Sequence, residues 1–209
     1  PLIASENLSN VFRISATLKR PIQPDLLQQA LEEVLPLRKD FRVKLRRGVF
    51  WYYFEENTRT PKIQREVTYP CRYIDPHGNQ KYLFRVTYFQ RRINLEVFHA
   101  LTDGLGASTF LKQLIYRYLQ METKRTQDEP FLDEMGAESS FSQKFSLPAD
   151  VEDSYLANYR DTKKGNYSSR PAYRLTGNYL PWGSSQIIHG YLNLAGLKAV
   201  CKGYGVSIT

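Results

Sequence analysis

The stretch His-Ala-Leu-Thr-Asp-Gly at residues 99–104 has residue types and spacing that indicate chemistry. A neutral imidazole is a natural general base for an alcohol or amine, and partial burial of a histidine favours its neutral form. The carboxylate of Asp103 follows four residues later, where it can hold a turn or cap a helix. Gly104 is expected to supply backbone freedom at a sharp turn. His99 is therefore predicted to be the reactive side chain.

A strand, a turn and a helix are predicted to position this stretch. In the strand 93–99, His99 has the same parity as three aliphatic residues, so its side chain is expected to point with theirs toward the interior. An amphipathic helix is predicted over residues 105–121. Its apolar stripe comprises Phe110, Leu111, Leu114 and Tyr118.

The rest of the chain predicts further strands and helices in mixed order. They are a strand at 11–18, a helix from Pro24 to Pro36, two strands within 41–54 about a turn at 47–48, irregular chain at 58–78, a strand at 83–90 that forms a hairpin with 93–99, strands at 173–179 and 186–194, and a helix at 195–204. Strands and helices do not alternate strictly, which indicates an α+β (mixed α/β) class.

The pattern His-x-x-x-Asp-Gly between a strand and a helix resembles the signature of the chloramphenicol-acetyltransferase-like acyltransferases. This superfamily includes alcohol acetyltransferases, plant BAHD acyltransferases, wax-ester synthases and condensation domains of nonribosomal peptide synthetases. The flanking sequence is most similar to bacterial alcohol-acetyltransferase-like proteins and to condensation domains. The resemblance implies a mixed, largely antiparallel sheet flanked by helices, with residues 1–209 as the first half of an enzyme. This half would not be active by itself.

Two departures from the superfamily pattern accompany the resemblance. The motif has one histidine, preceded by Phe98, where condensation domains usually carry two in succession. The motif Asp-Phe-Gly-Trp-Gly of the second half of BAHD enzymes is absent. Residues 1–170 are interpreted as the N-terminal acyltransferase domain, with an acidic crossover at about 125–170, and residues 171–209 as the start of the second half.

The resemblance implies transfer of an acyl group, in particular acetyl, from a coenzyme A thioester to an alcohol or amine, with His99 as the general base. Acyl-CoA would be a co-substrate and not a tightly bound cofactor, and the sequence assigns no residue to its binding. The alternatives are a condensation-type enzyme that depends on an acyl carrier protein and a non-catalytic binding relative of the fold. The resemblance also implies that Asp103 pairs with a buried arginine. Arg13 and Arg42 are both candidates, and Arg42 is slightly favoured because Phe-Arg-Val-Lys-Leu resembles a Leu-Arg-x-x-Phe region of condensation domains.

The net charge of +8 favours anionic partners such as nucleic acid, a membrane surface or a phosphate-bearing co-substrate. Basic and aromatic residues mix in the stretch 37–54, which is a pattern of nucleic-acid-binding proteins. A hairpin with one basic face explains the same residues more simply, with the aromatic side chains lining a pocket for an apolar acceptor or acyl chain. No nucleic-acid partner is therefore expected.

The two cysteines, Cys71 and Cys201, have no metal-like spacing and are too few for a disulfide framework. No metal site is expected, and a reduced, cytoplasmic setting is predicted. No apolar run reaches the roughly 18 residues that a membrane-spanning helix needs, so no membrane span is expected.

Overall fold

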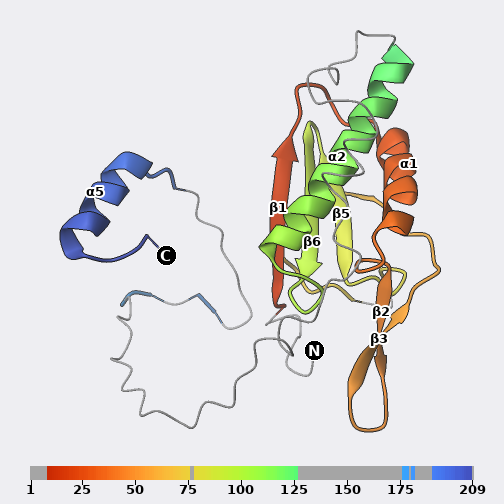
Figure 1. The fold of residues 1–209 in the computed structure, drawn as a ribbon, viewed down its shortest axis with the longest axis horizontal. Helices are drawn as coiled ribbons and strands as arrows, with labels where there is room; N and C mark the ends of the chain where they lie inside the picture. Colours follow the sequence, from red (N-terminus) through yellow and green to blue (C-terminus); the bar gives the residue numbers. More distant parts are fainter. Residues whose placement is uncertain (1–8, 76–77, 127–175, 179, 182–189, 209) are drawn as a thin grey trace. The chain divides into compact units, whose positions relative to one another are not determined.

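The computed structural model describes residues 9–75, 78–126, 176–178, 180–181 and 190–208, and the chain divides into two units, Pro1–Ser169 and Arg170–Thr209 (Figure 1). The elements are β1 (Val11–Thr17), α1 (Pro24–Val34), the short 3₁₀ helix η1 (Leu35–Leu37), β2 (Val43–Arg47), β3 (Tyr52–Glu56), β4 (Gln64–Arg65), β5 (Phe84–Phe89), β6 (Arg92–Phe98), α2 (Gly104–Thr126) and α5 (Leu194–Tyr204). The predicted α+β class is confirmed.

Four strands of the first unit form one sheet in the order β1-β6-β5-β4. The β1–β6 and β5–β6 pairs are antiparallel, whereas β4 pairs with β5 in parallel. The register places Arg13 of β1 opposite Glu96 of β6, and Glu96 opposite Arg85 of β5. The sheet is therefore mixed and largely antiparallel, as predicted.

Helices α1 and α2 pack together on one face of the sheet and bury the main apolar core (Figure 1). At its centre, the ring of Phe41 stacks on that of Phe110 with centroids 4.2 Å apart. Phe84 of β5 meets Phe110 edge-on at 5.4 Å. Offset stacking and edge-on contacts are the arrangements that aromatic quadrupoles favour, so these rings fix how α2 sits on the sheet.

Helix α1 forms where the sequence predicts it. Pro24 occupies its first turn, where a backbone N–H would have no acceptor within the helix, so the N–H that proline lacks is not missed. The predicted apolar stripe from Leu27 to Val34 is buried. Gln23 precedes the helix without capping it through its side chain; instead, its backbone N–H donates to the hydroxyl of Tyr118 at 3.0 Å. A side chain of α2 thus satisfies the backbone N–H of the residue that precedes α1.

Strands β2 and β3 form a separate two-stranded hairpin that pairs with no other strand among the described residues and extends away from the four-stranded sheet (Figure 1). Leu45, the middle residue of β2, packs against a small apolar cluster that contains Phe98 and against which Leu101 also packs. These residues lie on either side of His99 in the sequence. The middle of β2 therefore lies near the turn that follows β6.

Helix α5 of the second unit has side-chain and backbone caps. The Oδ1 atom of Asn193 accepts a hydrogen bond from the N–H of Gly196 at 2.9 Å. Gly205 ends the helix in the left-handed region with φ of +64°, and the N–H of Val206 donates to the carbonyl of Cys201. A glycine at this position avoids the strain that a Cβ would bring.

The helices and strands predicted within residues 9–126 and the helix predicted at 195–204 are confirmed, with small changes in length. Helix α2 continues to Thr126, five residues beyond the prediction, and the irregular stretch 58–78 contains the two-residue strand β4. The predicted crossover at 125–170, the boundary at 170–171 and most of the strands predicted at 173–179 and 186–194 lie outside the described residues. The described parts of these two strands, 176–178 and 190–193, are not in a strand, and Leu194 already begins α5.

Candidate functional site

His99 lies immediately after β6 and before α2, with its side chain exposed. Its backbone N–H donates to the carbonyl of Asn10 at 2.9 Å, which continues the pairing of β1 with β6. Its imidazole packs against Phe12, with ring centroids 5.0 Å apart and tilted by 55°. Phe12 in turn packs against the main core. The expected inward orientation is wrong, because the imidazole lies at the border of the core and faces solvent.

The imidazole of His99 makes no side-chain hydrogen bond to any other residue that the structure describes. Ring contact with Phe12 holds it in place while its nitrogens stay available. A base at such a position can accept a proton from a ligand without first breaking a protein hydrogen bond.

Asp103 caps the N-terminus of α2. Its Oδ1 atom accepts a hydrogen bond from the N–H of Gly106 at 2.8 Å, and its carbonyl accepts the first helical bond, from Ala107. This is the arrangement of an N-cap aspartate, which satisfies one of the free N–H groups of a helix start. The side chain is exposed.

The expected ion pair between Asp103 and an arginine is not formed, because neither Arg13 nor Arg42 contacts Asp103. Arg13 forms ion pairs with Glu66 and Glu96 on the sheet face opposite the helices. Arg42 pairs with Glu56 at 3.4 Å. Both guanidinium groups have nearer carboxylates, and the helix N-terminus provides the partner of Asp103.

The nearly buried arginine of this region is one that the sequence did not indicate. Arg38 is 3% exposed and forms two hydrogen bonds to Asp40, at 2.9 and 2.6 Å. It also donates to Gln113 of α2 at 2.8 Å, and its guanidinium lies over the ring of Phe41. The spacing Arg-x-Asp after Pro36 was the available signal. Arg38 links the end of η1 to α2 and does not reach His99 through any described contact.

The close approach near this turn occurs at Gly106 in the first turn of α2, and not at Gly104. Gly104 begins α2 without a left-handed backbone angle, and a Cβ built on it meets nothing within 4 Å. A Cβ on Gly106 would lie 2.0 Å from the Oγ1 atom of Thr102. The expected role of Gly104 in a sharp turn is therefore wrong, because the close approach occurs two residues later.

A network of charged side chains covers the sheet face opposite the helices. Glu96 is 1% exposed, and its carboxylate accepts hydrogen bonds from Arg13, Arg85 and the backbone N–H of Cys71. Asn94, on the same strand, donates to Thr87 at 3.1 Å. Each acceptor is thus satisfied, which is the condition under which a buried charge is tolerated.

Glu66 continues this network beside β4. Burial opposes its ionisation, but hydrogen bonds from Arg13 and Arg92 outweigh burial and lower the pKa of Glu66 below its usual value of 4.5. Glu66 also accepts from Asn94 at 3.2 Å. The network links β1, β5 and β6 through side chains that satisfy one another, which indicates a structural role and not a reaction centre.

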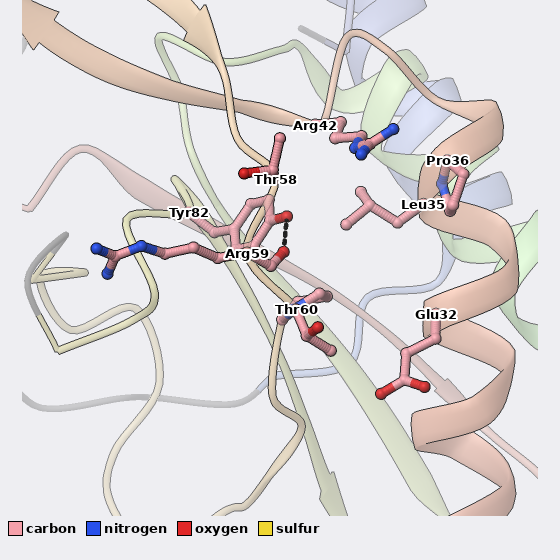
Figure 2. A pocket seen from close by; sticks show the side chains of 9 residues that line it. Glu32, Leu35, Pro36, Arg42, Thr58, Arg59, Thr60 and Tyr82 are labelled. Carbon is pink, nitrogen blue, oxygen red and sulfur yellow. Dashed lines mark hydrogen bonds between the residues drawn. The ribbon is translucent and has the colours of Figure 1, made fainter.

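An open pocket of about 210 Å³ lies between the C-terminal end of α1 and the loop that follows β3 (Figure 2). The hydroxyl of Tyr82 faces the pocket and donates a hydrogen bond to the carbonyl of Arg59. Arg42 and Glu32 lie on opposite sides of it. The lining residues are Glu32, Leu35, Pro36, Arg42, Thr58, Arg59, Thr60, Pro61 and Tyr82. Neither His99 nor the aromatic side chains of the hairpin line this pocket.

Two features are absent from the residues that the structure describes. No group of three or more histidine, cysteine, aspartate or glutamate side chains there is placed to hold a metal ion. No helix in the same ranges combines the length and apolarity needed to cross a membrane.

Comparisons with known proteins give a limited likeness. No protein-family model matches the sequence, and no curated protein matches it. The starter condensation domain of rhizomide synthetase RzmA aligns with a TM-score of 0.44 and 15% identity, over 54% of this chain and 33% of that chain. SgcC5 from Streptomyces globisporus, solved in complex with (R)-(-)-1-(2-naphthyl)-1,2-ethanediol and sucrose, aligns with a TM-score of 0.43 and 14% identity, over 68% and 36%. The chain thus spans about a third of the length of these structures, and a likeness of this extent establishes no family.

Proposed function

We propose that the chain is part of an acyltransferase of the chloramphenicol-acetyltransferase-like type, in which His99 is the general base. The substrates proposed are an acyl-CoA, in particular acetyl-CoA, and an alcohol or amine acceptor. The proposal draws on the sequence motif and on one observation of the structure. That observation is the exposed imidazole at the junction of β6 and α2, which rests on Phe12 and has no hydrogen-bond partner among the described residues.

In the proposed reaction, the acceptor oxygen or nitrogen attacks the carbonyl carbon of the thioester while His99 takes the acceptor proton. The tetrahedral intermediate then breaks its bond to sulfur, and the departing thiolate takes the proton from the imidazolium. No bond forms between enzyme and acyl group. A hydrogen-bond donor to the intermediate oxyanion is required, and no described residue is assigned to that role.

Asp103 acts in this proposal as a positioning residue. By capping α2 through Gly106, it fixes the helix start that follows His99 by five residues. The turn between the imidazole and the helix is short, so a helix that frays at its first residues would let the imidazole move.

The test is an assay of thiol release from acetyl-CoA with a panel of alcohols and amines, on the full-length protein of which this chain is proposed to be a part and on its His99→Ala variant. Turnover should fall by roughly 10²–10⁴, the range for removal of a positioned base. His77→Ala and His189→Ala change the other two histidines of the sequence and serve as matched controls. An activity of His99→Ala within a few-fold of the parent would exclude His99 as the base.

The donor is tested in the same experiment with an acyl carrier protein in place of CoA. Turnover with the carrier protein alone, still lost in His99→Ala, would replace the CoA-dependent proposal with the condensation-type alternative. An absence of turnover with every donor and acceptor, together with acceptor binding that His99→Ala does not change, would indicate a non-catalytic relative.

A further inference from the structure

The turn of the β2–β3 hairpin carries large apolar side chains where polar ones are usual. The N–H of Gly48 donates to the carbonyl of Trp51 at 2.7 Å, so Val49 and Phe50 are the two central residues of the turn. They are 84% and 88% exposed, and Trp51 is 65% exposed. Turns normally hold glycine, proline, asparagine, aspartate or serine at such positions. Exposed apolar residues gathered at one site point to a contact surface.

Basic residues lie directly behind this apolar tip. Arg47 is paired across the hairpin with Tyr52, and Arg46 with Tyr53. Glu55 lies further from the tip and pairs with Lys44 and Arg46. Arg47 forms no ion pair with any carboxylate that the structure describes. The end of the hairpin thus combines an apolar turn with a net positive charge behind it.

The acidic residues of the hairpin lie further from the turn than Arg47, and the carboxylate of Glu55 reaches back only as far as Arg46. Glu55 and Glu56 pair across the strands with Lys44 and Val43, the two rows most distant from the turn. At about 3.4 Å per residue, the Arg46 and Arg47 rows lie within roughly 5–10 Å of the turn. That distance equals the depth to which interfacial elements enter a bilayer, about 5–10 Å.

We propose that the hairpin tip, residues 49–53, inserts into the surface of an anionic lipid membrane. Phe50 and Val49 enter the acyl boundary, and the amphipathic rings of Trp51 and the two tyrosines lie at the headgroup level, where such rings are enriched in membrane proteins. Arg47 contacts lipid phosphates. This inference does not depend on the proposed acyl transfer.

The form of the surface favours lipid over the other partners of a basic chain. The tip is a narrow projection, whereas single-stranded nucleic acid requires a groove with successive stacking platforms (Figure 1). Insertion also has a consequence for orientation. Because Leu45 of β2 packs against the apolar cluster that contains Phe98, a tip held in a membrane brings the His99 end of the sheet toward the lipid surface.

The test is co-sedimentation of the protein with vesicles of phosphatidylcholine alone and of phosphatidylcholine with phosphatidylserine. Binding should be strongest to the anionic vesicles. Phe50→Ser combined with Trp51→Ser should weaken it by roughly tenfold or more, the factor expected when two aromatic side chains lose partial burial. Val67→Ser combined with Tyr191→Ser, which removes two other exposed apolar side chains, should leave binding unchanged. Arg46→Gln combined with Arg47→Gln should reduce the preference for anionic vesicles.

Insertion is measured directly on a protein whose hairpin tip is unchanged. In a Trp182→Phe background, Trp51 is the only tryptophan of the sequence, and brominated lipids should quench its fluorescence. Absence of quenching, or equal vesicle binding by the tip variant and the parent, would overturn the proposal. Self-association or oligonucleotide binding that depends on the tip, without vesicle binding, would also overturn it, in favour of a second copy or of nucleic acid.

Discussion

Glu96 and His99 are three residues apart at the end of the same chain segment, yet their surroundings are opposite. Glu96 lies on the sheet face away from the helices, and two arginines and a backbone N–H satisfy its carboxylate. His99 lies past the last residue of β6 and keeps a ring contact with Phe12 but no hydrogen bond among the described residues. A side chain whose partners are complete supports the fold, whereas one held only by packing can exchange a proton with a ligand.

Substitution at Glu96 and at His99 should therefore change the free energy of unfolding by very different amounts. Removal of one partner from a buried ion pair leaves an uncompensated charge, which is costly. Truncation of an exposed side chain outside such a network changes stability little. The following substitutions test this difference, each through the free energy of unfolding measured in denaturant at neutral pH unless stated otherwise.

The largest loss is expected for Glu96→Ala. Arg13 and Arg85 would lose their shared carboxylate, and the free energy of unfolding should fall by about 3–5 kcal/mol. The matched control is Glu33→Ala, which breaks a solvent-exposed ion pair with Arg117 and should cost less than about 1 kcal/mol. Equal losses in the two variants would contradict a structural role for the Glu96 network.

A smaller loss is expected for Asp103→Ala. It removes the N-cap of α2, so the free energy of unfolding should fall by about 1 kcal/mol, within a range of roughly 0.5–2. Asp103→Asn and Asp103→Ser keep a side-chain oxygen acceptor and should recover most of it. A loss near that of Glu96→Ala would instead indicate the buried arginine pair that the described contacts lack.

Glu66 should account for part of the loss of folding stability at acidic pH. Its pKa is lower in the folded protein than in the unfolded chain, so its contribution is complete above about 4.5 and is lost as the pH falls through the folded value. Glu66→Gln should flatten the decline of stability below pH ~4.5 by up to about 1.4 kcal/mol per pH unit, the slope of one proton. An unchanged slope would show that Glu66 is not the group responsible.

The smallest effect is expected for His99→Ala. Its imidazole is exposed and has no described hydrogen bond, so the free energy of unfolding should stay within about 0.5 kcal/mol of the parent. Together with the loss of turnover proposed above, this result would show that His99 serves the reaction and Glu96 serves the stability of the fold. A marked loss of stability would show that contact with Phe12 contributes more to the core than to a site.

The fold could be predicted where a local pattern repeats over several residues. Alternation defined β1 and the β5–β6 hairpin, and the stripe from Leu27 to Val34 defined α1. Strand β4 could not be predicted, because two residues are too few to show a period and its partner β5 lies about twenty residues further along the chain. Short parallel pairs depend on tertiary contacts that no local pattern records.

The candidate site was predictable in position but less so in detail. The spacing placed His99 at the junction of a strand and a helix, which is correct. Its parity predicted burial, but β6 ends at Phe98, and beyond a strand end parity no longer determines direction. The partner of Asp103 was missed in the same way, since a helix N-terminus one turn away competes successfully with an arginine that is distant in the sequence.

Helices α1 and α2 share a hydrogen bond between the N–H of Gln23 and the hydroxyl of Tyr118, which are 95 residues apart in the chain. An isolated helix of the eleven residues of α1 is marginal in water, because its first turn must be ordered before any bond repays that cost. Gln23, the residue before α1, provides no side-chain cap, and its backbone N–H finds the hydroxyl of Tyr118 only when α2 has docked. The two helices should therefore become ordered in one cooperative step, whose rate is set by closure of a long loop and not by helix propagation.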